Sequence, residues 1–152
     1  MSGTVQVRRA VAVDASLLQA LAAQIPAAPQ WSAAIWKEVL LPGGAVDRNV
    51  VIAEVAGEAA GFAVASLVAG VAEIESIAVA EAARRRGIGR LLTDAVLQWV
   101  RERSGRAIEL EVRASNAQAI AFYEALGFRE QARRVKYYSQ PTEDALLFSR
   151  SL

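Results

Sequence analysis

The stretch Arg84-Arg85-Arg86-Gly87-Ile88-Gly89-Arg90 is the most informative part of this chain. It follows residues 71–79, which are typical of a strand, and it precedes residues whose apolar positions repeat at helical spacing. Gly87 and Gly89 lack side chains, so backbone N–H groups there can approach a ligand closely. The first N–H groups of the helix have no acceptor inside it, and the helix dipole attracts anions. With its arginines, the turn predicts a pyrophosphate site on the N–H groups of residues 85–90.

A plainer interpretation of this turn is an ordinary strand-to-helix connection with a solvated run of arginines. The strand before it, the arginine cluster and the long helix after it favour the phosphate site. Two common phosphate loops are excluded: the chain contains no G-x-x-x-x-G-K-[ST] sequence, and Leu92 stands where the third glycine of G-x-G-x-x-G belongs. The expected ligand is therefore phosphate-bearing but is neither ATP nor NAD.

The chain on either side of the turn predicts the element order β-α-α-β-β-β-α-β-α-β-β. Before the turn we expect a strand at 5–8 and a helix that Asp14 caps and that ends at about Ala23, with Leu17, Leu18 and Leu21 on its buried face. A second helix follows, capped by Ser32, with Trp31 and Trp36 as a hydrophobic staple. Three strands come next, at 49–55, 59–68 and 71–79, and the first two are joined by a hairpin at Gly57-Glu58. After the turn we expect a helix that stops at Ser104-Gly105 and buries Ile88, Leu91, Leu92, Ala95, Val96, Trp99 and Val100. A strand at 107–112 follows, and then a helix from Ser115 or Asn116 to Leu126 that ends in a left-handed Gly127. The last two elements are strands at 128–138 and 144–149. This order predicts a layered α/β (α+β) domain with a mixed, mostly antiparallel sheet of about seven strands and about four flanking helices.

The composition narrows the chemistry. The 152 residues include no cysteine and no histidine, and the formal net charge is +1. We expect one domain over residues 1–152, with no metal and no direct nucleic-acid partner, whose acid–base chemistry uses carboxylates, tyrosine, lysine or the backbone. The start of the chain has no apolar leader and no apolar run reaches about 18 residues, so we expect a cytoplasmic protein without a membrane partner.

On Arg84-x-x-Gly87-x-Gly89, which matches [QR]-x-x-G-x-[GA], the chain resembles the GCN5-related N-acetyltransferases. More narrowly, it is similar to the bacterial ribosomal-protein-alanine N-acetyltransferases in the runs LEVRASN (110–116) and AIAFYEALGF (119–128), in Tyr137-Tyr138, in Glu143-Asp144-Ala145 and in Trp31-Ser32. The resemblance implies an acetyltransferase (GNAT-like) fold and acetyl-CoA as co-substrate. The chain departs from the family at residues 25–31, where Gln30 separates Pro29 from Trp31 in a region that shapes the family's peptide site.

The resemblance also implies a role for each site residue. Glu111 is the general base, Tyr123 protonates the departing coenzyme A thiolate, and Asn116 contacts the cofactor. The backbone around Ile77, Ala78 and Val79 supplies oxyanion donors, and the pyrophosphate lies on Arg85, Arg86, Gly87, Ile88, Gly89 and Arg90.

Plainer interpretations stand beside these roles: a strand glutamate paired with an arginine, a half-buried core tyrosine and a simple helix N-cap. Glu109 alternates onto the face of Glu111, and Glu73 and Glu75, on the strand before the turn, are rival bases. Tyr137 and Tyr138 are neighbours on a predicted strand, so at most one of them is expected to line the acceptor groove.

The implied reaction is direct acetyl transfer to an amine, without a covalent enzyme intermediate. Deprotonating an α-amine with a pKa of about 8 at pH 7 costs about 1.4 kcal/mol, against roughly 4.6 for a lysine side chain, so a lone carboxylate suits the α-amine. By resemblance the acceptor is the N-terminal alanine of a small-subunit ribosomal protein, and we expect a monomeric enzyme. An acetyltransferase for a small amine, amino acid or antibiotic, and a silent acyl-CoA-binding module, remain alternatives.

Overall fold

The computed structural model describes residues 3–44, 46–139 and 141–152, and its elements follow the predicted order. The strands are β1 (Val5–Arg9), β2 (Asp47–Val55), β3 (Glu58–Val68), β4 (Val71–Val79), β5 (Ala107–Arg113), β6 (Arg129–Tyr138) and β7 (Glu143–Ser151). The helices are α1 (Ala15–Ala23), α2 (Ala33–Leu40), α3 (Ile88–Glu102) and α4 (Ala117–Ala125), with short 3-10 turns at Ala12–Asp14 and Glu81–Ala83. The predicted fold class is confirmed.

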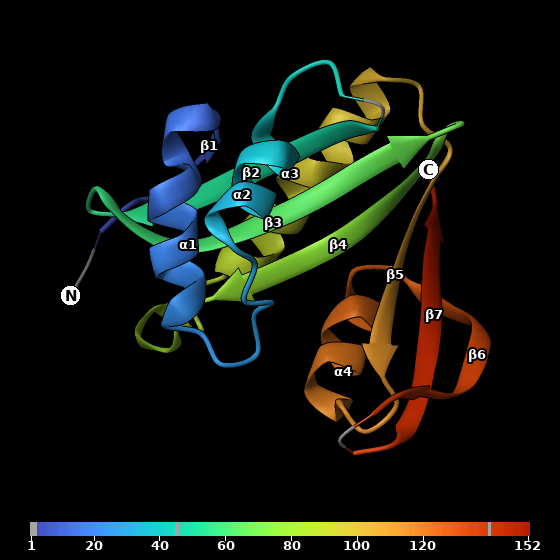
Figure 1. The fold of residues 1–152 in the computed structure, drawn as a ribbon. Helices are drawn as coiled ribbons and strands as arrows, with labels where there is room; N and C mark the ends of the chain where they lie inside the picture. The colour runs from blue at the N-terminus through green and yellow to red at the C-terminus, as the bar shows by residue number, and fades with distance from the viewer. Residues whose placement is uncertain (1–2, 45, 140) are drawn as a thin grey trace.

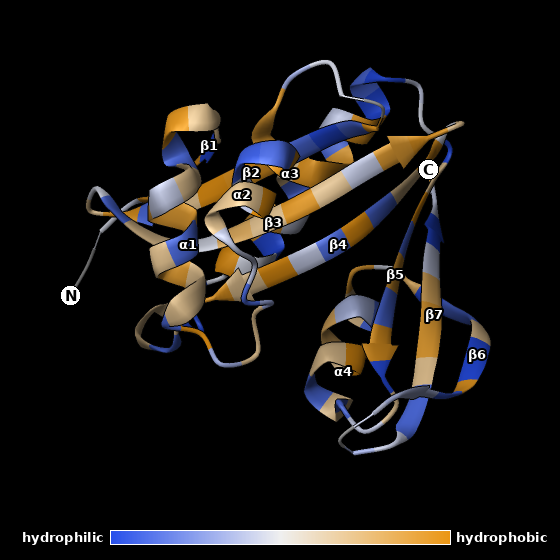
Figure 2. Cartoon of the chain, viewed as in Figure 1, coloured by the Kyte–Doolittle hydropathy of each residue, from blue (hydrophilic) through white to orange (hydrophobic). Residues whose placement is uncertain are grey.

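The strands form a single mixed sheet in the order β1-β2-β3-β4-β5-β7-β6. Neighbouring strands are antiparallel except β4 and β5, which run parallel. Figure 1 shows α1 and α2 on one face of β1–β4, α3 on the other face, and α4 beside β5 and β7. Residues of β5 alternate between hydrophilic and hydrophobic in Figure 2, as expected for a strand with one face in the core.

Two tight hairpins connect β2, β3 and β4. The first turn is Ala56-Gly57, with φ of 53° and 83°, and the second is Ala69-Gly70, with φ of 51° and 82°. Positive φ at both central residues is the type I′ pattern that matches the twist of the flanking strands. The predicted hairpin is therefore present, but its turn lies one residue earlier than Gly57-Glu58, because Glu58 already pairs with Val55.

The start of α2 follows the sequence pattern. The Ser32 hydroxyl accepts a hydrogen bond from the Ile35 N–H at 3.2 Å, and the rings of Trp31 and Trp36 lie 4.8 Å apart. The predicted cap and hydrophobic staple are confirmed.

Asp14 precedes α1, but its carboxylate does not cap that helix. It accepts a hydrogen bond from the Val11 N–H at 2.8 Å and forms an ion pair with Arg8 at 2.9 Å. The 3-10 turn before α1 aims the side chain back at β1, so the predicted cap is wrong.

Two leucines placed on buried helix faces are partly exposed. Leu17 of α1 and Leu91 of α3 each keep 39% exposure, whereas Leu18 and Leu92 are fully buried. Each lies at the edge of an apolar stripe, where helical spacing alone leaves the border uncertain by one residue. The left-handed Gly127 is confirmed by its φ of 90°, and β6 begins one residue after the buried Phe128.

Gly61 allows three elements to meet. A Cβ atom there would lie 2.8 Å from the Ala78 carbonyl oxygen of β4 and 3.3 Å from the Ile88 side chain at the start of α3. Gly61 therefore fixes how closely the end of β4 and the first turn of α3 approach β3.

We predict that Gly61→Ala lowers the free energy of unfolding by about 1–3 kcal/mol, because the backbone oxygen at this position must move. The matched control is Gly44→Ala, whose new methyl group would lie 3.8 Å from the Val46 carbonyl oxygen, an ordinary van der Waals distance. That control should stay within about 0.5 kcal/mol of the parent protein in urea unfolding. Equal stability of the two variants would contradict the prediction.

Candidate active site

The turn from β4 to α3 has the backbone of an anion site. Arg85 and Gly87 adopt φ of 64° and 74°, and Gly87 is the residue before the first turn of α3. The N–H groups of Ile88, Gly89 and Arg90 open this helix and have no acceptor within it. Gly89 faces α4, since a Cβ atom there would lie 3.2 Å from the Phe122 ring. The predicted turn thus combines helix N–H donors with the arginine side chains of residues 84–90.

The two central parallel strands separate soon after they begin. β4 and β5 pair through Val71–Ala107, Ala72–Ile108 and Glu73–Glu109, and the ladder then ends (Figure 1). From Ile74 onwards β4 is paired with β3 on one side only among the described residues. The other edge of β4 leads directly to the turn at residues 84–90.

The backbone register identifies which N–H groups lie on this open edge. Ala80 donates to the Ala60 carbonyl at 2.8 Å, and Ala78 is paired with Phe62. In an antiparallel ladder alternate residues face the partner strand, so the Ala78 N–H points to β3. The N–H groups of Ile77 and Val79 therefore point to the open edge.

A β-bulge at Glu75 changes the face that β4 presents. Val64 pairs with Ser76 while Ala65 pairs with Ile74, so Glu75 is the extra residue. Before the bulge, Ile74 belongs to the core under α3; after it, Ala78 belongs to the core under α1 and α2. As a result Ile77 and Val79 pack on the α3 side, the side that carries the turn.

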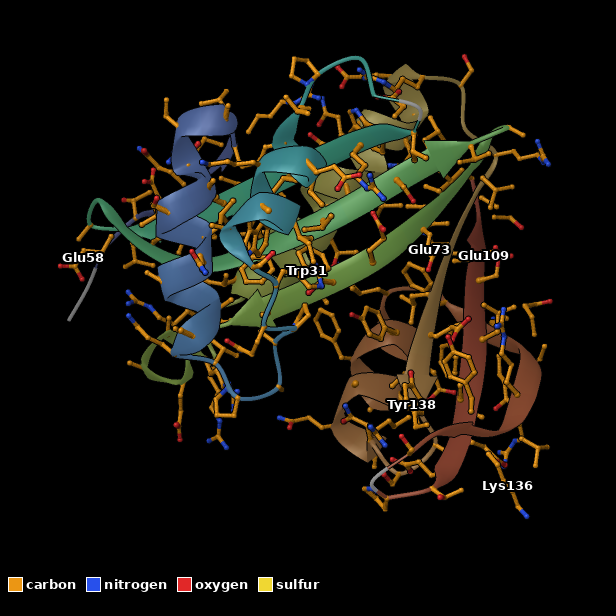
Figure 3. All side chains as sticks on the ribbon, viewed as in Figure 1. Trp31, Glu58, Glu73, Glu109, Lys136 and Tyr138 are labelled. Carbon is orange, nitrogen blue, oxygen red and sulfur yellow. The ribbon has the colours of Figure 1, made fainter. Side chains whose placement is uncertain are left out.

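Four carboxylates gather on the opposite face: Glu73 and Glu75 of β4 and Glu109 and Glu111 of β5. In β5 the alternating partners Ile108, Leu110 and Val112 are buried, which directs the glutamates away from α3 and α4. Glu73 and Glu109 are register partners and lie where the strands separate (Figure 3). Although Glu73 is exposed as a whole residue, burial of its carboxyl raises the pKa, and the charges of Glu75, Glu111 and Glu109 raise it further.

Two of these four carboxylates, those of Glu75 and Glu111, form ion pairs with arginines. The Glu75 carboxylate accepts hydrogen bonds from Arg48 Nε at 2.9 Å and from Arg48 Nη2 at 3.4 Å, a bidentate ion pair with β2. Glu111 contacts Arg134 Nη2 of β6 at 3.3 Å, and its side chain keeps 21% exposure. The anticipated pairing of Glu111 with an arginine is thus present, and Glu75 is held in a structural ion pair.

Tyr123 lies on the other side of β5, in α4. Its side chain is 6% exposed and stacks edge-on against Phe122 at 5.0 Å and Phe128 at 5.6 Å. Burial raises the pKa of the Tyr123 hydroxyl well above its usual range. The hydroxyl is protonated at neutral pH, as an exposed tyrosine also is, and its burial makes it a weaker acid.

Asn116 caps α4, as its plainer interpretation proposed. The Asn116 Oδ1 atom accepts a hydrogen bond from the Ala119 N–H at 3.1 Å. This cap occupies the oxygen and leaves the side-chain amide N–H groups available to a ligand.

Tyr137 and Tyr138 do not follow simple strand alternation. The β6–β7 register shifts between Arg134 and Tyr138, and Lys136 has a φ of 53°. The two rings pack edge to face at 5.2 Å, Arg113 lies over Tyr138 at 4.2 Å, and Arg134 lies over Tyr137 at 5.2 Å. The expectation that the two rings face opposite ways is wrong, because the irregular strand brings them together.

The distinctive segment at residues 25–31 is tied to the end of α1. Gln30 Nε2 donates to the carbonyls of Ala22 at 2.8 Å, Ala28 at 3.0 Å and Ile25 at 3.4 Å. This clamp leads into Trp31, which packs on the core between the α1–α2 layer and the sheet, on the same side as Glu73 and Glu109 (Figure 3). The sequence of residues 25–31 departs from the family pattern, but nothing in it predicts that Gln30 clamps the end of α1.

A cavity of about 570 Å³ lies elsewhere, between the end of α2 and the start of β2, and is lined in part by Arg9, Leu41 and Arg103. It is at the far end of the sheet from residues 84–90. Within the described ranges, no group of acidic side chains is arranged to hold a metal ion. No helix in that part of the chain is long and apolar enough to cross a membrane.

Comparison with known proteins assigns the family. The model of the acetyltransferase (GNAT) family matches residues 17–128. The chain belongs to the acetyltransferase (GNAT) family. The family match includes the turn, both separating strands, Glu111 and Tyr123.

Three known proteins show how far the similarity extends. The [ribosomal protein bS18]-alanine N-acetyltransferase of Salmonella typhimurium is 42% identical over 92 residues, which cover 59% of this chain and 62% of that protein. The match therefore spans less than two thirds of that relative. The crystal structure of the ribosomal-protein-S18-alanine N-acetyltransferase from Escherichia coli has a TM-score of 0.84 at 29% identity and covers 97% of this chain and 94% of its own. Arabidopsis thaliana NAA60, solved with acetyl-CoA, has the same fold with a TM-score of 0.84 at 21% identity, covering 98% and 99% of the two chains.

Proposed function

We propose that this chain is an acetyl-CoA-dependent N-acetyltransferase that acetylates the α-amine of a protein N-terminus, and that the physiological acceptor is the N-terminal alanine of a small-subunit ribosomal protein. The observation that carries the proposal is the separation of β4 and β5. This separation leaves the N–H groups of Ile77 and Val79 without a partner strand in the described part of the chain. The N-terminus of α3 and the buried Tyr123 lie on one face of the sheet beside these groups, and the four glutamates of β4 and β5 lie on the other face. The similarity to the bS18-alanine enzymes supports the choice of acceptor.

The residues present fit acetyl-CoA. The turn at residues 85–90 offers helix N–H groups and arginines to a pyrophosphate, and the space beside Gly87 is open, since a Cβ atom there would have no neighbour within 4 Å. The N–H groups of Ile77 and Val79 on the open edge of β4 can pair with the amides of an extended chain, in the manner of an added strand. Asn116 offers its amide N–H groups at the start of α4. Bound acetyl-CoA supplies the acetyl group as a thioester.

The protein's own residues then divide the proton transfers. Glu111 first takes a proton from the acceptor's ammonium group, which frees the nitrogen lone pair to form the N–C bond, and the second N–H proton leaves to solvent as the amide forms. The β4 N–H groups stabilise the negative charge that develops on the carbonyl oxygen. Tyr123 gives its proton to the sulfur as the C–S bond breaks. Base and acid work from opposite faces of β5.

The cofactor site predicts the effect of a charge at position 89. Gly89→Glu should weaken acetyl-CoA binding at least roughly tenfold in calorimetry, about 1.4 kcal/mol, because a carboxylate would stand beside the diphosphate. Arg90→Glu, at an exposed position on the same turn, should weaken binding in the same direction without crowding Phe122. Gly44→Glu adds the same charge far from the turn and serves as control. Unchanged affinity in folded Gly89→Glu and Arg90→Glu would contradict the site.

The assignment of base and acid predicts that Glu111→Gln and Tyr123→Phe each lower kcat by roughly 10²–10⁴, the usual effect of losing one proton-transfer group. Acetyl-CoA affinity should change little in either variant. Glu75→Gln is the matched control on β4, where the carboxylate is held by Arg48, and we expect activity near that of the parent. An inactive Glu75→Gln together with an active Glu111→Gln would move the base to β4.

The acceptor is tested by competition among peptides that begin Ala-Arg, Leu-Arg or N-blocked Lys, scored by kcat/KM. We expect the alanine peptide to lead, because an α-amine needs less help to lose its proton and a tight pocket penalises each extra methylene by about 1–3 kcal/mol. Faster acetylation of the blocked lysine peptide, or of a free polyamine, would replace the acceptor class while leaving the acetyltransferase proposal in place.

A further inference from the structure

Arg134 is the cation that lies against the proposed base. Its Nη2 atom is 3.3 Å from Glu111 Oε1, and its side chain keeps 57% exposure. The nearby pairs Arg133–Asp144 and Arg113–Glu143 are shorter, at 2.9 and 3.0 Å, and each is also a hydrogen bond. The Arg134 contact is therefore the longer and more exposed ion pair of this group.

The path of Arg134 to Glu111 depends on the strand order. β7 lies between β6 and β5, so the guanidinium reaches a carboxylate two strands away. The β7 residue paired with Arg134 is Ala145, whose small side chain offers little obstruction. Arg134 begins the irregular stretch of β6 that ends at Tyr138, and its guanidinium lies over the Tyr137 ring. The side chain thus has solvent on one side and an aromatic surface on the other.

Charge on this face is incompletely balanced by its arginines, because Arg113, on the same face of β5 as Glu111, is paired with Glu143. Arg48 is bound to Glu75 by two hydrogen bonds, which leaves Glu73, Glu109 and Glu111 with Arg134 as the cation at Glu111. Arg134 also acts electrostatically on Glu73. A second cation that enters here meets an attractive field, whereas a neutral or anionic group does not.

We propose that Arg134 is a place-holding cation: it occupies the position of the acceptor's ammonium group at Glu111, and acceptor binding displaces it into solvent. This inference rests on the proposed function, and it narrows the acceptor class to amines that arrive as cations and compete with a guanidinium. The displaced side chain loses its contact with Glu111 and extends into solvent. Arg134 is a specificity-determining residue and takes no part in proton transfer.

The proposal predicts a split between KM and kcat. Arg134→Gln removes the competitor, so KM for an Ala-Arg peptide should fall roughly two- to fivefold, as expected for an exposed ion pair, with kcat unchanged. Arg134→Lys keeps a cation and should keep a KM near that of the parent. Arg133→Gln, which breaks the neighbouring pair with Asp144, is the matched control and should leave KM unchanged.

Guanidinium ion provides a more specific test than the substitution alone. At the highest concentration that leaves the protein fully folded, guanidinium chloride should raise the KM of Arg134→Gln towards the parent value, and sodium chloride at equal ionic strength should not. A fall in kcat at constant KM in Arg134→Gln would instead mean that Arg134 orients the base. That result, or a KM insensitive to guanidinium, would overturn the proposal.

A binding experiment separates this inference from the proposed function. In an NMR titration of the full chain with the Ala-Arg peptide, the Arg134 Nε–H signal, assigned by its loss in Arg134→Gln, should shift, and the N-acetylated peptide should leave it in place. No shift with the free peptide would reject the place-holding role. Absence of acetyl transfer to any amine by the parent protein would reject the proposed function, and the titration would still decide on Arg134.

Discussion

The ladder between β4 and β5 ends after Glu73–Glu109, and the rest of the site depends on this separation. Strands stay hydrogen-bonded only while their backbones remain about 4.8 Å apart, so diverging strands leave N–H groups without a partner in the sheet. Ile77 and Val79 present such groups, and the bulge at Glu75 together with the absence of a side chain at Gly61 sets how β4 lies against α3. Because no hydrogen bonds join β4 and β5 beyond this point, a ligand can pass between the two strands. It would then reach both the face with the N-terminus of α3 and the face with the glutamates of β4 and β5.

The ion pairs fall into two kinds: short pairs that join elements of the fold, and a longer, exposed pair whose cation a ligand could replace. Arg8–Asp14, Arg48–Glu75 and Arg113–Glu143 join strands or turns at 2.9–3.0 Å. Arg134–Glu111 is longer and more exposed, and exposed pairs contribute little free energy. A pair of that kind can be exchanged for a ligand's charge at small cost, and for this reason we propose that the acceptor is recognised at Glu111 and not at Glu75.

Sequence patterns were most successful where a single local rule decides the structure. The Ser32 cap with its Trp31–Trp36 staple, the bounds of β4 and the left-handed Gly127 all follow from short-range chemistry. They failed where a neighbour in space intervenes. Asp14 turns to Arg8, Leu17 and Leu91 lie outside the cores that their spacing suggested, and an irregular register brings Tyr137 and Tyr138 together.

By itself the sequence determined the fold class, the turn at residues 84–90 and the short list of candidate glutamates, because glycine spacing, strand alternation and helix periodicity are local properties of the chain. Only the tertiary structure decided which arginine, if any, pairs with each candidate glutamate. The sheet order places β6 beyond β7, so no spacing along the chain could predict that Arg134 reaches Glu111 while Arg48 holds Glu75. The bulge at Glu75 likewise decided which β4 residues face α3, since a one-residue insertion in a ladder depends on the partner strand and leaves no mark in the sequence of β4 alone.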